Sequence, residues 1–148
     1  METSYGAYSS QWNQIRKRIE SCNYLDIHEV NLYDYNGNFI FEGKIYENIV
    51  DNEKKLDFFK KSRKYAIDEI KSGKYDCIIE LGSGWGSNIF YFYTEYPELN
   101  IDVISGEYTM EGVETQKYVK DKYFSDKNLS IYSFNYLESF NFFTPLHI

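Results

Sequence analysis

The sequence is short of cysteine, of histidine and of long apolar runs. Its two cysteines, Cys22 and Cys77, are too few and too far apart for a disulfide scaffold or a zinc site. The two histidines, His28 and His147, lack partners at metal-ligand spacing. No apolar run approaches the ~20 residues of a membrane span, and no signal-peptide pattern opens the chain. These absences predict a soluble, cytoplasmic protein without a metal centre.

Basic residues are also in deficit. The 148 residues include 23 Asp or Glu and 16 Lys or Arg, which makes the formal net charge −7 at pH 7. A negative field repels phosphate backbones, so nucleic acid is a disfavoured partner. Aromatic residues, in contrast, make up 20% of the chain, far more than a disordered segment carries. The chain should therefore fold around one sizeable core.

The first fifty residues predict a helix and then a β-hairpin. Ser9 and Ser10 suit the N-cap of a helix with a single apolar stripe. This stripe consists of Trp12, Ile15, Ile19 and Cys22. Further on, Asn36-Gly37 separates two β-prone runs, which is the strongest short hairpin signal because a type I′ turn needs positive φ at both positions. We expect a hairpin at about 30–42 and treat residues 1–50 as an N-terminal extension.

Residues 51–148 predict an α/β domain. A charge-rich helix from 51 to 71 precedes Gly73, which suits a helix C-cap. The alternating elements that follow are a strand at 75–81, a helix at 88–96, a strand at 101–105, a helix at 110–123 and a strand at 129–134. This order is typical of a parallel sheet with flanking helices. The first strand is a short apolar run, so we expect both of its faces to be buried, with Cys77 a small core side chain.

Three glycines spaced by two stand between the first strand and its helix. Gly82 permits a tight turn, Gly84 lets the backbone approach a ligand, and the helix N-terminus after Gly86 offers unpaired N–H groups. A dinucleotide fingerprint needs its third glycine where Ser87 stands, and a phosphate loop needs a lysine that is absent. The spacing predicts a polar or anionic ligand. A purely structural turn or another nucleotide site is the alternative.

With the strand before it, this turn resembles the first motif of class I S-adenosylmethionine-dependent methyltransferases. The motif is an acidic residue and Gly-x-Gly-x-Gly after an apolar strand, matched by Glu80-Leu81-Gly82-Ser83-Gly84-Trp85-Gly86 after Cys77-Ile78-Ile79. The resemblance covers about 75–137. It implies a Rossmann-like fold, S-adenosylmethionine as cofactor, and a place for Glu80 near the cofactor's amino group.

The resemblance also implies the other residues of the cofactor site. In the family an acidic residue after the second strand holds the ribose hydroxyls, and Glu107 takes that place; a carboxylate can accept both hydroxyl protons. After the third strand, Asn135 suits the adenine amino group better than its nearest polar rival, Ser133. The full set of expected cofactor-binding residues is Glu80, Gly82, Ser83, Gly84, Trp85, Gly86, Asn88, Glu107, Tyr108, Asn135 and Tyr136.

Several of these residues have a second interpretation. Trp85 either packs over the cofactor or anchors the glycine turn to the core. Glu107 is otherwise a solvated loop acid or a charge favoured by the dipole at a helix N-terminus. Tyr5, Tyr8 and Trp12 either cover the cofactor as an N-terminal lid or, as we favour, simply pack as part of a helix.

The resemblance stops before the sheet is complete. Family members carry a larger sheet, and no fourth strand is visible before Ile148. We therefore expect a Rossmann-like sheet truncated after its third strand, with an exposed edge that invites self-association or a partner chain.

The predicted function is that of the cofactor-binding part of a methyltransferase. The acceptor is an unidentified small molecule or protein, because the Asn-Pro-Pro-Tyr and Asp-Pro-Pro-Tyr signatures of nucleic-acid amino methylation are absent. No catalytic side chain stands out, as expected where the sulfonium is already reactive and the protein mainly positions it. The alternative is a non-catalytic cofactor-binding module or a half-domain completed by a partner.

Overall fold

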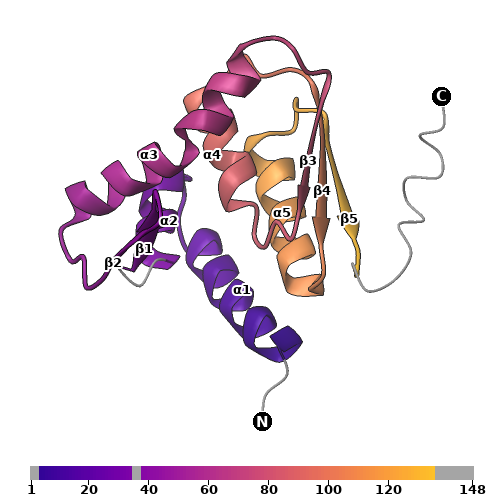
Figure 1. Cartoon of the computed structure of the whole chain (residues 1–148). Coiled ribbons are helices and arrows are strands. Elements are labelled where there is room, and N and C mark those ends of the chain that lie inside the picture. The colour runs from indigo at the N-terminus through magenta and orange to yellow at the C-terminus, as the bar shows by residue number, and fades with distance from the viewer. Residues whose placement is uncertain (1–3, 35–37, 136–148) are drawn as a thin grey trace.

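The computed structural model describes residues 4–34 and 38–135, which form a three-stranded parallel sheet with helices and a separate small hairpin (Figure 1). The parallel strands, in the spatial order β3–β4–β5, are β3 (Cys77–Leu81), β4 (Asp102–Glu107) and β5 (Leu129–Ser133). The connecting helices are α4 (Ser87–Glu95) and α5 (Met110–Tyr123). The prediction of an α/β, Rossmann-like sheet that ends with its third strand is confirmed for these residues.

The register of the sheet brings the carboxyl ends of its strands together. Leu81 at the end of β3 lies opposite Gly106 of β4, and Glu107 of β4 lies opposite Ser133 of β5. All three strands therefore end at the same edge, which is where open parallel sheets of this kind bind ligands.

Helices cover one face of the sheet. In Figure 1, α4 and α5 lie on the same side of the strands, with α1 (Ser4–Glu20) beyond them. The core on this side consists largely of aromatic and branched side chains, among them Ile15, Ile19, Trp85, Phe90, Val103 and Val119. The N-terminal helices thus share one core with the sheet.

The prediction that β3 is buried on both faces is wrong. Ile79 is 46% exposed and Leu81 49% exposed, and Cys77 is exposed instead of being a small core side chain. Within the described residues β3 is an edge strand with helices on one face only, so its alternate side chains face away from the core.

The predicted hairpin at about 30–42 is also wrong. Residues of its first half form α2 (Ile27–Asp34), which starts where the Asp26 side chain accepts hydrogen bonds from the backbone N–H groups of His28 and Glu29, at 3.0 and 3.2 Å. Asn36-Gly37 lies outside the described residues. Helix α2 prevails over the apparent alternation because its Ile27, Val30 and Asn31 are buried.

The observed hairpin comes later in the chain. It pairs β1 (Phe39–Phe41) with β2 (Lys44–Tyr46), and Glu42 and Gly43 form the turn. Their φ angles are 50° and 76°, the positive values that a type I′ turn requires. A glutamate at the first turn position concealed this hairpin, because Asn or Asp is the usual sequence signal there.

The charge-rich helix was predicted correctly, whereas the start of the first helix was not. Helix α3 (Asn52–Lys71) begins after Asp51, whose side chain caps the Glu53 N–H at 3.0 Å, and Gly73 follows it with φ 74°. Helix α1 begins at Ser4, so Ser9 and Ser10 lie inside the helix and are not its N-cap.

Candidate functional site

The glycine turn directly follows β3 and is attached to β4. Gly82, Gly84 and Gly86 have φ angles of 75°, 60° and 94°, a region that side-chain-bearing residues rarely adopt. The backbone N–H groups of Gly82 and Ser83 donate to the Gly106 carbonyl at 2.8 and 3.2 Å. The turn is thus held at the edge of the sheet where the three parallel strands end.

Glu107 meets this turn directly. Its Oε1 accepts a hydrogen bond from the Gly84 N–H at 3.1 Å, and its Oε2 accepts from the N–H and hydroxyl of Thr109 at 3.0 and 2.6 Å. Glu107 is only 5% exposed, which rules out the solvated loop acid. The structure therefore brings together the glycine turn and the carboxylate that the sequence had paired.

A buried network of polar side chains joins the turn to α5 and β4. Gln116 of α5 donates to the Gly84 carbonyl at 2.7 Å and to the Ser83 hydroxyl at 2.8 Å, and accepts from Ser105 at 2.6 Å. The hydroxyls of Ser83 and Ser105 are 2.5 Å apart. Because these groups satisfy one another away from water, they hold the turn in one conformation. Gln116 and Ser105 were not predicted as site residues, since no local feature of the sequence marks a polar residue as buried.

Helix α5 can approach the site this closely only because it carries a glycine. A Cβ atom on Gly112 would lie 2.7 Å from Cγ of Glu107 and 2.7 Å from the carbonyl oxygen of Gly84. Both neighbours are buried and hydrogen-bonded, so neither can easily move away.

Gly112→Ala should therefore destabilise the protein, although alanine normally stabilises a helix relative to glycine by about 0.5–1 kcal/mol. We expect the free energy of unfolding to fall by about 1–3 kcal/mol, the usual effect of overpacking. Urea denaturation followed by circular dichroism measures it. Lys117→Ala, at an exposed position of the same helix, should change stability by less than about 0.5 kcal/mol. A more stable Gly112→Ala variant would contradict the close packing.

Glu80 presents an unsatisfied acceptor next to the glycine turn. Its Oε1 accepts from the Asn88 side-chain amide at 2.8 Å, whereas its buried Oε2 has no partner among the described residues. Burial raises the pKa of Glu80, opposed by the Asn88 hydrogen bond and the charge of Arg63, and assisted by the charge of Glu107. An orphaned buried acceptor is a suitable place for a donor group of a ligand.

The raised pKa of Glu80 sets the sign of a pH effect. Between the ordinary value of 4.5 and the higher pKa in the folded protein, the folded chain binds more protons than the unfolded chain at this site. Its contribution to stability therefore falls as pH rises through that window. In Glu80→Gln this fall should disappear, so the unfolding midpoint should depend less on pH above 4.5. Thermal unfolding measured at a series of pH values gives this dependence, and Glu98→Gln, at an exposed position, is the control. If the unfolding midpoint changes equally with pH in both variants, the prediction for Glu80 is refuted.

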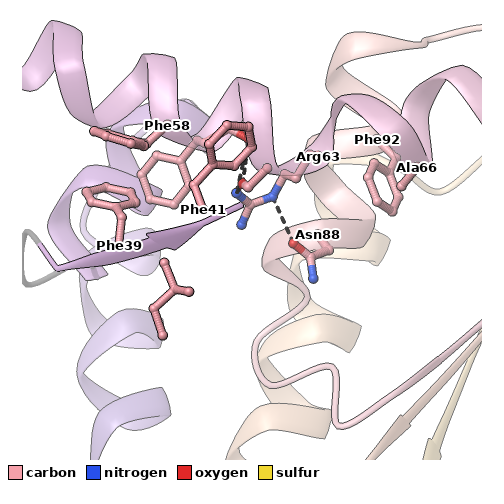
Figure 2. Close-up of a pocket in the computed structure, with 10 residues that line it drawn as sticks. Phe39, Phe41, Phe58, Arg63, Ala66, Asn88 and Phe92 are labelled. Carbon is pink, nitrogen blue, oxygen red and sulfur yellow. Dashed lines mark hydrogen bonds between the residues drawn. The ribbon is translucent and has the colours of Figure 1, made fainter. Parts of the chain in front are cut away.

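A chain of side-chain hydrogen bonds extends from Glu80 away from the turn. Asn88 accepts from Nε of Arg63 at 2.8 Å (Figure 2), and Nη2 of Arg63 lies 3.4 Å from the Ser87 hydroxyl. Ser87 donates in turn to Asn31 of α2 at 2.7 Å. Arg63 and Asn31 were not predicted as site residues, because their connection to the motif exists only once α2, α3 and α4 have packed together.

Trp85 belongs to the core. Its side chain is fully buried, its Nε1 donates to Asp34 at 3.3 Å, and its ring lies near Phe90. The structure therefore supports the interpretation in which the Trp85 ring anchors the turn to the core. Any contact between Trp85 and a ligand would involve its main chain.

The remaining predicted residues lie along the same edge. Tyr108 follows Glu107 and is 40% exposed, and Asn135 is half-buried just after β5. The neighbouring backbone N–H of Phe134 donates to the Glu107 carbonyl at 2.9 Å, which places Asn135 close to the end of β4. Tyr136 lies outside the described residues.

Helix α1 contacts the turn through one aromatic ring. A Cβ on Gly84 would lie 2.8 Å from Cζ2 of Trp12, so the indole lies against this glycine, and Tyr8 stacks on Trp12 with ring centroids 6.2 Å apart. Arg16 also joins α1 to α5 through a 2.8 Å ion pair with Glu114. Helix packing, the favoured interpretation of this segment, accounts for these contacts; the side chain of Tyr5 lies outside what the structure describes.

Two other kinds of site are absent from residues 4–34 and 38–135. No group of three or more His, Cys, Asp or Glu side chains is arranged to hold a metal ion. Within the same ranges no helix combines the length and the hydropathy needed to cross a bilayer.

Comparison with known proteins gives a likeness in structure without a match in sequence. No protein-family model matches the sequence, and no curated protein matches it. Among solved structures, the chain is similar to a geranyl diphosphate methyltransferase in complex with GPP and sinefungin, with a TM-score of 0.47 and 12% sequence identity. The match covers 88% of this chain and 51% of that one, so the chain spans about half the length of the methyltransferase. At this level of similarity no residue role is transferred.

Proposed function

We propose that this chain binds S-adenosylmethionine and forms the cofactor-binding part of a methyltransferase. The observation that carries the proposal is the 3.1 Å hydrogen bond from the Gly84 N–H to the Glu107 carboxylate. It means that a glycine turn after one parallel strand and an acid at the end of the next lie together at one sheet edge. This is the arrangement that the sequence motif requires, and such edges bind nucleoside ligands.

The residues present suit this cofactor. Oε2 of Glu80, which has no partner in the part of the chain that the structure describes, is an acceptor for an amino group, and Glu107 is an acceptor for ribose hydroxyls. An ionised carboxylate has about four lone-pair sites, of which Glu107 already uses three. One ribose hydroxyl can therefore donate to the remaining site of the Glu107 carboxylate, whereas a second hydroxyl must replace one of the present hydrogen-bond donors. Asn135 would contact the adenine amino group.

The bound cofactor supplies an activated methyl group, and the protein supplies position. The hydrogen bonds from Gly84 and Thr109 hold the Glu107 carboxylate in one orientation before any ligand arrives. Preorganisation of this kind orients the reacting groups and excludes water. The acceptor in this proposal is a small molecule or a protein, and the location is cytoplasmic, consistent with two unpaired cysteines.

A second candidate function is a cofactor-binding module completed by a partner chain. The exposed edge and apolar outer face of β3, where Ile79 and Leu81 are half exposed, favour it, because parallel sheets are normally covered on both faces. Both candidates require the same ligand.

Calorimetric titration with S-adenosylhomocysteine tests this shared requirement. We expect saturable binding to the full chain, weakened at least about tenfold in Glu107→Ala, which loses both acceptors. Glu107→Gln keeps one acceptor oxygen and should bind with intermediate affinity, and Glu98→Ala is the matched exposed control. Circular dichroism establishes that each variant is folded. No binding by folded wild-type protein would refute the proposal.

A further inference from the structure

The two oxygens of the Glu107 carboxylate lie in different surroundings. Oε1 accepts one hydrogen bond from the described residues, donated by the Gly84 N–H at 3.1 Å. Oε2 accepts two, from the N–H of Thr109 at 3.0 Å and from its hydroxyl at 2.6 Å. Each carboxylate oxygen has about two lone-pair sites. Oε2 is therefore saturated, whereas Oε1 keeps one site for a further donor.

Helix α5 also covers Oε2 by packing against it. A Cβ atom on Gly112 would lie 2.8 Å from Oε2 and 2.7 Å from Cγ of Glu107, so the backbone of the helix lies directly against this side of the carboxylate. Figure 1 shows α5 starting beside the end of β4, the strand that carries Glu107. A ligand atom therefore cannot reach Oε2 from the side of α5.

The donor that occupies Oε2 is itself fixed. The Thr109 hydroxyl donates to Glu107 and accepts from the Gly112 N–H at 3.1 Å, which caps the first turn of α5. Thr109 is only 1% exposed. A ligand hydroxyl that took its place at Oε2 would leave the Thr109 hydroxyl without its acceptor in the protein interior, which is unfavourable. Exchange at Oε2 is thus opposed by both the packing and the cap.

We propose that Glu107 accepts a hydrogen bond from only one of the two ribose hydroxyls of the cofactor, through Oε1, while Oε2 holds the start of α5. This inference rests on the proposed function and narrows the specificity of the same site. It departs from the bidentate contact that the sequence resemblance implies, in which both hydroxyls donate to one carboxylate. The second hydroxyl makes no contact with Glu107, so a ligand that lacks it still binds.

The probes are S-adenosylhomocysteine and its 2′-deoxy and 3′-deoxy analogues, each of which lacks a single ribose oxygen. Calorimetric titration of the full chain should show one analogue binding at least about tenfold more weakly than S-adenosylhomocysteine, because it has lost a hydrogen bond to a charged group. The other analogue should bind within about threefold of S-adenosylhomocysteine. A loss of tenfold or more for both analogues, or for neither, would overturn the proposal.

Glu107→Ala tests whether the missing hydrogen bond is made by Glu107. In this variant the weakened analogue and S-adenosylhomocysteine should bind with equal affinity, because the partner of the deleted hydroxyl is also gone. Glu98→Ala, at an exposed position, should keep the wild-type difference. A difference that persists in folded Glu107→Ala would mean that another residue recognises the hydroxyl, and would overturn the proposal. The wild-type comparison does not depend on the folding of any variant.

Failure of this inference can be distinguished from failure of the proposed function. Binding of S-adenosylhomocysteine with an equal loss for both analogues would uphold the cofactor site and refute the single-hydroxyl contact. No binding of any of the three ligands by the folded chain would refute the proposed function and this inference with it.

Discussion

Trp85→Ala is expected to lower the free energy of unfolding by about 3–5 kcal/mol, the usual loss for truncating a fully buried tryptophan. Trp85 is 0% exposed and is the largest of the fully buried side chains, and its indole N–H also joins α2 through Asp34. Since small proteins are stable by only about 5–15 kcal/mol, a loss of this size should populate the unfolded state at modest temperature.

Urea denaturation monitored by circular dichroism measures this loss without depending on tryptophan fluorescence. Trp12→Ala is the matched control, because Trp12 is only half-buried and packs at the edge of the core. Its loss should be clearly smaller. Equal losses in the two variants would mean that Trp85 does not anchor the glycine turn to the core.

Gly84→Val is expected to abolish binding of S-adenosylhomocysteine. Gly84 has φ 60°, where a β-branched residue is strained, and the new Cβ would lie 2.8 Å from the Trp12 ring. Its N–H and carbonyl also hold Glu107 and Gln116. Moving this peptide therefore displaces both the turn and the carboxylate expected to bind the ribose.

Gly73→Val separates the loss of binding from general strain. Gly73 has a similar φ of 74°, but it follows α3 and a Cβ there would meet nothing within 4 Å. This variant should be destabilised by the backbone conformation and still bind the ligand. Calorimetric titration measures binding in both variants, and circular dichroism establishes that they are folded. Binding retained in Gly84→Val would contradict the proposal that the glycine turn is part of the cofactor site.

Elements that depend on contacts between residues close in the sequence could be predicted, whereas elements that depend on distant contacts could not. Helix α3, with its Asp51 cap and Gly73, was predicted because capping and amphipathic periodicity are local. The hairpin was misplaced because the helix at α2 depends on the burial of Ile27 and Val30 against other elements.

The candidate site divides in the same way. The three glycines could be predicted because positive φ angles restrict which residues can occupy them. Gln116, Asn31 and Arg63 could not be predicted, since each is a common polar residue that matters only through the neighbours that folding brings to it.

By itself the sequence determined the order of strands and helices from α3 to β5, the sharp turn after the first parallel strand, and the acid at the end of the second. These features depend on backbone conformation and on residue type within short segments. Tertiary structure alone decided that Glu107 closes onto Gly84, and that one buried oxygen of Glu80 has no partner among residues 4–34 and 38–135. The reason is that hydrogen bonds and burial between distant residues arise only when packing brings them together.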